Sequence, residues 1–482
     1  MVNSLALSLI LACSRGAPER SAEPEASVDE ATQPDIVLVL VDTLRADHLG
    51  VYGYERPTSP HIDAWAQGAS VFDRAYAHSG WTLASVASLF TGRLPHQHRT
   101  GHAPVADGLY CPLPDDVPTV AEQLRAAGYR TGAFINNTFL APEFRLNRGF
   151  EHWDWVGSSN LEHRSAADTV AAALQWMGEA PDTPVYAVVH MMEPHAFYNP
   201  PEPFLGTFSD AHPLPEGQVI DRSTIVSWQT YEALPTPEQR DRLIALYDEE
   251  ILTVDAAFQA LLDGLEARPA DRPTLVVFTA DHGEEFWDHG GYEHGHTLMG
   301  ELTRVPLIVK GPGFGAGRFS TVVSHTDLVR SIRRLAGVAA EPGGDLQGIA
   351  AAGSYAGPRL SVSENTLYGP PRVSIVDDGY RLDIRQDKQV VSLWKVAADA
   401  SETQRVLGDQ ANALARPLFG QLIRIRGDAE PLASMTAAAC STEIPDPEVF
   451  SQLEALGYLD VRPEVPLDQA GGEPTGGGAS AE

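Results

Sequence analysis

Six consecutive aliphatic residues, Ile36 to Val41, constrain the fold of this 482-residue chain more than any other segment. A strand with one face in water alternates apolar and polar residues. An uninterrupted aliphatic and β-branched run is instead typical of a central strand that is buried on both faces. The run ends at Asp42, and functional sites of open α/β sheets gather at the carboxyl ends of the strands. The sequence therefore predicts an α/β fold in which Asp42 stands at a candidate site.

Apolar strand-like runs alternate with amphipathic helix-like segments along the next part of the chain. This alternation predicts a large, mostly parallel sheet sandwiched between helices. We expect strands at 129–135, 185–191, 274–279 and 304–309, and helices at 117–127, 166–178 and 240–265.

The pattern changes after about residue 350. Segments 372–384 and 390–396 are typical of short antiparallel strands, with turns at 377–379 and near Asp387, and 411–425 is typical of a helix. We therefore expect a domain over 35–349 and a small C-terminal α+β subdomain over 350–465.

The two ends of the chain differ in composition from these domains. Residues 5–12 form a short apolar run that closes on Ala12 before Cys13, although no Lys or Arg precedes it. Residues 1–13 resemble a lipoprotein signal peptide with Cys13 as the lipidated residue; another export signal, or an apolar N-terminus without a role, are the alternatives. We interpret 14–34 as a flexible linker and 466–482 as a disordered tail. This predicts an exported protein, periplasmic or at the cell surface, that meets a membrane only through a lipid anchor.

The net charge limits which partners can bind the chain, and the cysteine content bears on its compartment. The formal net charge is −31, which repels nucleic acid and argues against it as a partner. An anionic substrate would need a local positive centre, such as a metal ion. Cys111 and Cys440 either pair in an oxidising compartment or are two unrelated thiols.

Four segments carry residue types that suit phosphate or sulfate chemistry. Asp281 and His282 follow a buried strand and can bind one divalent cation, or form a turn with a capping Asp. Thr82 precedes a helical stretch, where it is an ordinary cap or lies beside an oxyanion. Histidines gather in 190–195 and 289–296.

Taken together, these segments resemble the sulfatase family within the alkaline-phosphatase superfamily, over about 35–458. The stretches that carry the resemblance include VLVLVDTLRADHLGVYGY (37–54), SLFTGRLPHQH (88–98), GYRTGAFINN (128–137), HMMEPHAFYNPP (190–201), TADHGEEFWDHG (279–290) and HGHTLMGELTRVPLIVKGPG (294–313).

The resemblance implies a metal-dependent ester hydrolase and a role for each matching residue. It implies one divalent ion (Mn²⁺, Zn²⁺, Mg²⁺ or Ca²⁺), an anionic ester substrate, and Thr82 as the nucleophile. The implied metal ligands are Asp42, Thr82, Asp281 and His282. The implied contacts to the ester or its leaving group are His190, His195 and His296, with Lys310 as a further substrate contact.

One departure from the family's pattern bears on the chemistry. Members active on sulfate esters usually carry a Cys or Ser that is converted to formylglycine, followed by a Pro and an Arg. This chain has Thr82, which that conversion does not accept, and Val86 in place of the Arg. The threonine resembles relatives that use a plain hydroxyl, such as phosphodiesterases, phosphonate hydrolases and phospho-alcohol transferases. We expect a hydrolase of sulfate or phosphate esters; a transferase acting on envelope lipids or glycans, or a non-catalytic binder of anionic glycans, are the alternatives.

Overall fold

The computed structural model describes residues 33–427 except 102–109, 158–162, 269–271, 342, 354–358, 389 and 398. The signal peptide expected at 1–13, most of the 14–34 linker, Cys13, Cys440 and the 466–482 tail lie outside the described residues. No helix within the described ranges is long and apolar enough to cross a membrane. Cys111 is disulfide-bonded.

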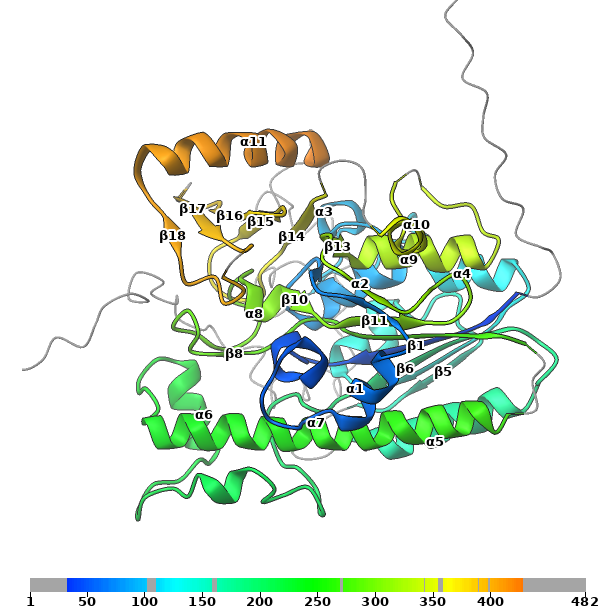
Figure 1. Cartoon of the computed structure of the whole chain (residues 1–482), viewed down its shortest axis with the longest axis horizontal. Helices are drawn as coiled ribbons and strands as arrows, with labels where there is room; N and C mark the ends of the chain where they lie inside the picture. The colour runs from blue at the N-terminus through cyan, green and yellow to red at the C-terminus, as the bar shows by residue number, and fades with distance from the viewer. Residues whose placement is uncertain are drawn as a thin grey trace, which may run out of the picture.

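An eight-stranded sheet forms the centre of the larger domain, in the order β12-β2-β11-β7-β1-β6-β4-β5 (Figure 1). Its strands are β1 (Asp35–Val41), β2 (Ser70–Phe72), β4 (Arg130–Ile135), β5 (His152–Trp155), β6 (Val185–Met191), β7 (Thr274–Ala280), β11 (Leu307–Lys310) and β12 (Gly317–Phe319). All neighbours pair in parallel except β11, which is antiparallel to both β7 and β2. Every residue of β1 is buried, as its uninterrupted aliphatic sequence predicts.

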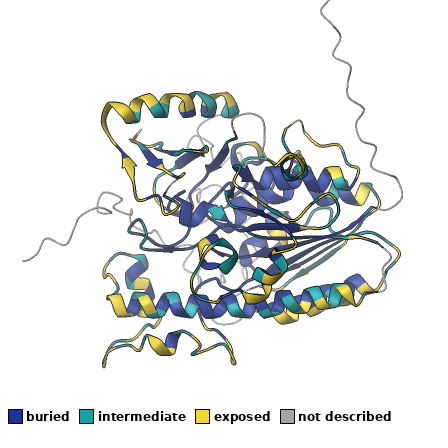
Figure 2. Ribbon diagram, viewed as in Figure 1, coloured by how far each residue is buried: buried dark blue, intermediate teal, exposed yellow. Residues whose placement is uncertain are grey.

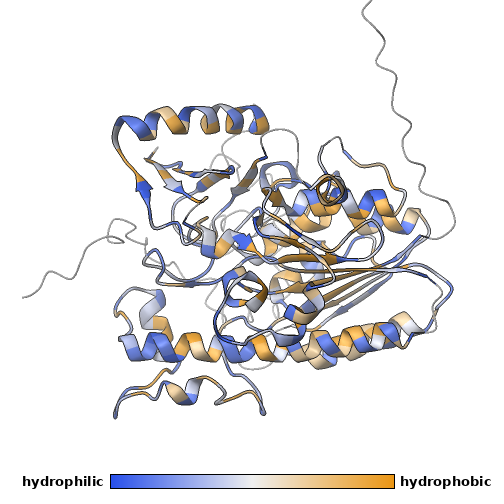
Figure 3. Cartoon of the chain, in the orientation of Figure 1, coloured by the Kyte–Doolittle hydropathy of each residue, from blue (hydrophilic) through white to orange (hydrophobic). Residues whose placement is uncertain are grey.

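Helices cover both faces of this sheet (Figure 1). One layer holds α1 (Pro60–Ala66), α5 (Ala166–Gly178) and α7 (Pro237–Glu266); the other holds α2 (Thr82–Thr91), α4 (Val120–Ala126), α9 (His325–Leu335) and α10 (Leu346–Ala352). Figure 2 shows the central strands buried while α7 exposes one face, and Figure 3 shows the matching apolar colour on the strands. The expected α/β sandwich is confirmed.

Shorter elements connect these layers. They are α3 (Pro95–His98), α6 (Arg222–Gln229), α8 (Gly300–Thr303), β3 (Ala75–Tyr76), β8 (Glu285–Phe286), β9 (Tyr292–Glu293), β10 (Arg304–Val305) and β13 (Val323–Ser324), with 3-10 turns at Ala46–His48, Gly50–Tyr52, Thr138–Leu140, Pro142–Phe144 and Ser209–Ala211.

The C-terminal subdomain is a five-stranded sheet covered by one helix, as the sequence predicted. The sheet has the order β14-β15-β16-β17-β18, and its described pairs are antiparallel. Its elements are β14 (Ser361–Glu364), β15 (Arg372–Val376), β16 (Tyr380–Arg385), β17 (Val390–Lys395), β18 (Arg405–Val406) and α11 (Gly408–Arg426).

Local sequence explains where the predictions held and where they failed. α5 and β6 have the predicted bounds. α4 begins three residues later than predicted, because Thr119 caps it through a hydrogen bond from the Glu122 backbone N–H. The single strand expected at 304–309 is wrong. Pro306 divides it, so that β10 pairs with β3 while β11 joins the main sheet.

Candidate active site

Two neighbouring parallel strands bring two carboxylates to one point. In the pairing of β1 with β7, Val41 lies opposite Ala280, so Asp42 and Asp281 leave the same sheet edge side by side. Asp42, Asp281 and His282 are fully buried, and each offers a ligand atom within 4.8 Å of the other two. Nε2 of His282 lies 3.3 Å from Oδ2 of Asp281 and 3.7 Å from Oδ1 of Asp42.

Thr82 faces this cluster from the first residue of α2. Its Oγ1 lies 3.3 Å from Nε2 of His282. The helix is fixed in place by Ser85, whose hydroxyl donates to the Asp281 carbonyl over 2.5 Å. No side chain caps the helix at Trp81, so the positive dipole end of α2, with N–H groups that no side-chain cap occupies, lies at the residue that faces the cluster. The four side chains expected to meet therefore do meet.

The buried acceptors of this cluster fit a divalent cation. Oδ1 of Asp42 and Oδ2 of Asp281 are buried without a hydrogen-bond partner. An uncompensated buried acceptor is costly, and a bound cation removes that cost. Carboxylate, imidazole and hydroxyl groups together form a donor set that suits Mn²⁺, Zn²⁺ or Mg²⁺.

The pKa values of the cluster residues are shifted by the same burial and close spacing of these groups. Burial, with the neighbouring Asp42 charge, raises the pKa of Asp281 well above its usual value. Burial lowers the pKa of His282 to about 4, which keeps its imidazole neutral and able to ligate a metal. The pKa of Asp42 is lowered to about 2, since nearby histidines, chiefly His190, outweigh the opposing effect of burial.

The remaining predicted histidines occupy different positions. His190, on β6, is fully buried, and its Nε2 lies 3.4 Å from Oδ2 of Asp42. His195 follows β6, with its Nδ1 2.7 Å from the Ala196 carbonyl oxygen. His296 instead pairs through Nε2 with Oε2 of Glu285 at 2.7 Å. Among the described residues, no hydrogen bond or ion pair joins His296 to Asp42, Asp281 or His282.

Lys310 lies away from the cluster. It pairs with Val276 of β7, four positions before Ala280, which corresponds to roughly 13 Å along a strand. Because β11 runs antiparallel to β7, its carboxyl end lies towards the opposite edge of the sheet. The side chain is exposed and lies beside Gly68. The structure does not bring Lys310 to the site.

Two residues at the site were not singled out from the sequence. Asn137 follows β4 at the same sheet edge, and its Nδ2 donates to Oδ2 of Asp42 over 2.6 Å and lies 3.5 Å from Oγ1 of Thr82. The ring of His294 is centred 4.6 Å from that of His282 and 5.0 Å from that of His195. A polar residue directly after a predicted strand was the available signal for Asn137. For His294 the signal was the His-rich loop itself.

Glu284 holds His294 in this position. Nδ1 of His294 lies 2.9 Å from Oε1 of Glu284, and the hydroxyl of Tyr198 donates to Oε2 of the same carboxylate over 3.0 Å. All three side chains are buried. A carboxylate at Nδ1 orients an imidazole and fixes its tautomer, so Glu284 holds the His294 ring beside that of His282.

Comparison with known proteins agrees with this geometry. The sulfatase family profile matches residues 34–338, and the chain belongs to the sulfatase family, whose members are metal-dependent ester hydrolases. The Delta 4,5-hexuronate-2-O-sulfatase of Bacteroides thetaiotaomicron is 24% identical over 354 residues, which cover 65% of this chain and 70% of that protein. The ulvan-active sulfatase of Formosa agariphila is 26% identical, over 64% of this chain and 63% of that protein.

Solved structures show the same fold. A 2-O GAG sulfatase superposes with a TM-score of 0.67 at 20% identity, covering 82% of this chain and 93% of its own. The phosphonate monoester hydrolase of Agrobacterium radiobacter superposes with a TM-score of 0.66 at 18% identity, covering 86% of this chain and 100% of its own. The alkaline-phosphatase-like architecture is thus shared by enzymes named for sulfate and for phosphonate esters.

Proposed function

We propose that this protein hydrolyses sulfate or phosphate esters with Thr82 as nucleophile, beside one divalent cation bound by Asp42, Asp281 and His282. The observation that carries the proposal is the position of the Thr82 hydroxyl, 3.3 Å from an imidazole of a buried Asp-Asp-His cluster. A bound divalent cation would lower the pKa of that hydroxyl and offset negative charge on the ester.

The groups around Thr82 would carry out the remaining steps of the reaction. The Thr82 hydroxyl releases its proton to water, its Oγ1 attacks phosphorus or sulfur, the bond to the leaving alcohol breaks, and the product is a covalent Thr82 ester. The first N–H groups of α2 lie where they can stabilise the ester's non-bridging oxygens. The leaving alkoxide takes a proton from an imidazole, with His195 and His294 as the candidates. Water then attacks the Thr82 ester, and its cleavage restores the hydroxyl.

Asn137 positions the first of the three ligands. Its amide donates to Oδ2 of Asp42, which leaves Oδ1, the oxygen without a partner, to face the cation. Hydrogen bonds of this kind fix the direction of a metal ligand. Asn137 is therefore a positioning residue that acts through Asp42.

The threonine favours phosphorus over sulfur. A formylglycine hydrate can expel sulfate by elimination, whereas a threonine sulfate has no second hydroxyl with which to do so. Turnover of a Thr82 sulfate then depends on water attack at sulfur and is slow. We therefore expect phosphate and phosphonate esters to turn over faster than sulfate esters. Sulfatases and phosphonate monoester hydrolases share this fold, so the expected order rests on the chemistry of the threonine.

The proposed location is outside the cytoplasm. Disulfides persist in oxidising compartments, and the disulfide at Cys111 is consistent with export. The lipid anchor at Cys13 stays a prediction, and the acidic net charge of −31 supports a substrate other than nucleic acid.

A substrate panel tests the proposal. Purified full-length protein, loaded in turn with Mn²⁺, Zn²⁺, Mg²⁺ or Ca²⁺, is assayed with nitrophenyl sulfate, phosphate, phosphodiester and phosphonate. We expect metal-dependent turnover, fastest on a phosphorus ester, loss of activity in Thr82→Ala and partial activity in Thr82→Ser. Mass spectrometry of quenched reactions should show one adduct on the peptide that contains Thr82.

Two outcomes would contradict the proposal. Full activity of Thr82→Ala would exclude the threonine as nucleophile. An adduct that passes to an added alcohol but not to water would identify a transferase instead.

A further inference from the structure

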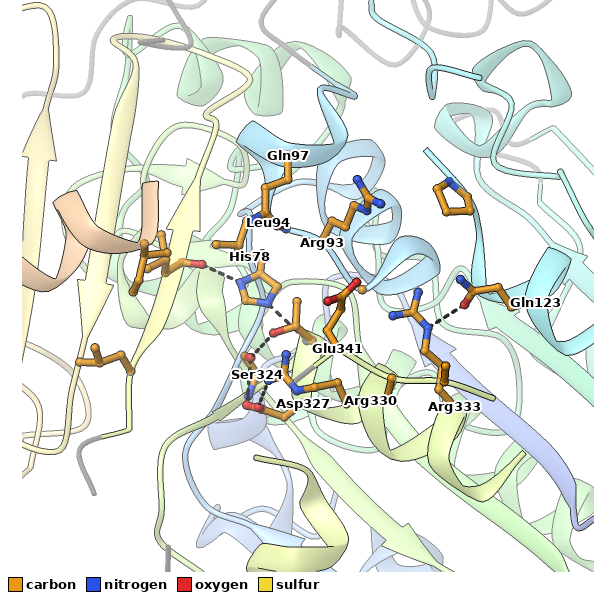
Figure 4. A pocket seen from close by; sticks show the side chains of 18 of the residues that line it. His78, Arg93, Leu94, Gln97, Gln123, Ser324, Asp327, Arg330, Arg333 and Glu341 are labelled. Atoms are coloured by element: carbon orange, nitrogen blue, oxygen red, sulfur yellow. Dashed lines mark hydrogen bonds and ion pairs between the residues drawn. The ribbon is translucent and has the colours of Figure 1, made fainter. Parts of the chain in front are cut away.

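A second site candidate lies at the other end of α2. A solvent-open cavity of about 880 Å³ is lined by the C-terminal end of α2, by α9 and by β14 and α11 of the C-terminal subdomain (Figure 4). Thr82 begins the ten-residue α2 and Gly92, which lines the cavity, follows its last residue. At 1.5 Å per residue the two ends are about 15 Å apart. The cavity is therefore separate from the candidate active site.

Basic side chains dominate the lining of this cavity. Four arginines contribute to it, against two carboxylates, Asp327 and Glu341. The arginines are Arg93, Arg330, Arg333 and Arg359. In a chain with 34 basic and 65 acidic residues, such an excess of positive charge around one cavity is locally opposite to the charge of the whole molecule.

Asp327 forms ion pairs with two of the four arginines. Its carboxylate forms ion pairs with Arg330 and, over 2.5 Å, with Arg359. The same carboxylate accepts from the backbone N–H and the hydroxyl of Ser324 at the start of α9. Asp327 therefore has its acceptor positions occupied and does not neutralise the remaining guanidinium groups.

Arg93 and Arg333 lack such a partner. Among the described residues, Arg333 donates to neutral oxygens alone, Oε1 of Gln123 at 2.7 Å and the Thr91 carbonyl at 2.9 Å. The side chain of Arg93 makes no hydrogen bond or ion pair with any described residue. Burial is the main cause that lowers the pKa of Arg333; Glu341 opposes this change, and the charges of Arg93 and Arg330 add to it.

The neutral groups of the cavity offer fewer donors to an anion than the arginines do, because both ring nitrogens of His78 are already hydrogen-bonded within the chain. Nδ1 of His78 lies 2.6 Å from the Val362 carbonyl, and its Nε2 lies 3.3 Å from the Thr326 backbone N–H. These contacts fix a neutral imidazole, whose pKa is lowered by burial. The hydroxyls of Ser324 and Thr326 and the amide of Gln97 also line the space. Figure 4 shows Arg93 and Arg330 on opposite sides of it.

We propose that this arginine cavity binds an oxyanion of the sulfate or phosphate class, either free or carried on an organic group. Guanidinium groups offer planar pairs of N–H donors that match such oxyanions. Two under-neutralised arginines would gain counter-charge from one dianion. The proposal does not depend on the reaction at Thr82.

Protection of arginines from chemical modification measures anion binding at this cavity. Phenylglyoxal modifies accessible arginines, and peptide mass spectrometry of the full-length protein gives the rate at each position. We expect inorganic phosphate and sulfate to slow modification of Arg93 several-fold and to leave Arg125 unaffected. Arg125 is an exposed arginine on α4 that pairs only with Glu151, so it is the matched control. Protection of neither residue, or of both equally, would overturn the proposal.

Calorimetry with two variants completes the test. Wild type and Arg125→Gln should bind titrated phosphate at this site. Arg93→Gln should show no binding there, or binding about tenfold weaker, and Arg93→Lys should be intermediate. Unchanged binding in Arg93→Gln, with circular dichroism of the folded protein, would overturn the proposal. Repeating the titration with a sulfated disaccharide separates the two sources: tighter binding than that of sulfate identifies a carried group, and equal or weaker binding identifies the free ion.

Discussion

Buried carboxylates have different partners at the edge of the central sheet that carries Asp42 and Asp281 and in the C-terminal subdomain. In the C-terminal sheet, Arg381 pairs with Glu402 over 2.7 Å, with both side chains at most 2% exposed, and Arg372 pairs with Asp383 over 2.6 Å. At the sheet edge, Asp42 and Asp281 are just as buried, yet within the described ranges only histidines stand within ion-pair distance of either carboxylate.

This difference separates structural charges from functional ones. A buried carboxylate with an arginine partner has its counter-charge within the chain, whereas two adjacent carboxylates without one repel each other and favour binding of a proton or a metal cation. The comparison predicts that removing a charge has opposite consequences in the two regions.

The largest effect is expected at the sheet edge. Asp281→Asn should lower turnover about a thousandfold or more, because it removes a ligand and its charge. The same change should raise the unfolding temperature of the metal-free protein, since it relieves repulsion with Asp42. Calorimetry with and without divalent ions measures both. A metal-free Asp281→Asn protein less stable than wild type would contradict this interpretation.

In the C-terminal sheet, removing a charge is expected to lower stability instead of raising it. Arg381→Met should destabilise the protein by about 3–5 kcal/mol, because the buried carboxylate of Glu402 loses its cationic partner and keeps, in the described part of the chain, only the hydrogen bond from the Gly300 backbone N–H. The increase in unfolding temperature on adding metal should persist. Urea unfolding measures the loss, with Arg125→Met as the exposed control, expected to cost less than about 1 kcal/mol. Equal losses in the two variants would show that burial does not set the cost.

Strand periodicity and strand ends account for what could be predicted of this site. The apolar runs before Asp42 and Asp281 located both residues at one sheet edge, because parallel strands share a direction. Lys310 was misplaced because the direction of β11 depends on tertiary pairing after Pro306, which its sequence does not encode.

Loop geometry accounts for what was missed. The choice between His294 and His296 depends on the β8–β9 hairpin, which pairs His296 with Glu285 and places His294 against His282. Asn137 stands at a strand end, but nothing in its sequence context distinguishes it from its neighbour Asn136. Periodicity predicts elements, not the direction of individual side chains in loops.

Asn137 offers an intermediate test at the sheet edge. Asn137→Ala should lower turnover about 10–100-fold, because Asp42 loses the donor that orients it. Metal affinity should fall in parallel, which distinguishes positioning of a ligand from contact with the ester. Asn136→Ala, at the adjacent residue bonded to Thr169 and His190, is the neighbouring comparison. A variant with reduced turnover but unchanged metal affinity would assign Asn137 to the substrate instead.

The smallest effect concerns Glu250, a buried carboxylate with neither an arginine nor a cation. Burial, with the nearby Glu193 charge, raises its pKa from 4.5 to about 8. The folded state therefore keeps a proton that the unfolded state releases above pH 4.5, and this lowers stability progressively up to about pH 8. Glu250→Gln should raise the free energy of unfolding by about 1 kcal/mol at pH 8 and have no effect at pH 4. Denaturant unfolding at the two pH values measures this, and an equal change at both would contradict it.

The central claim is that a cation completes the Asp42, Asp281 and His282 cluster beside the Thr82 hydroxyl. Anomalous diffraction from crystals grown with Mn²⁺ tests it most directly. The account predicts one strong peak within coordination distance of Oδ1 of Asp42, Oδ2 of Asp281 and Nε2 of His282, next to Oγ1 of Thr82. An active, manganese-loaded enzyme whose peak lies elsewhere would contradict it.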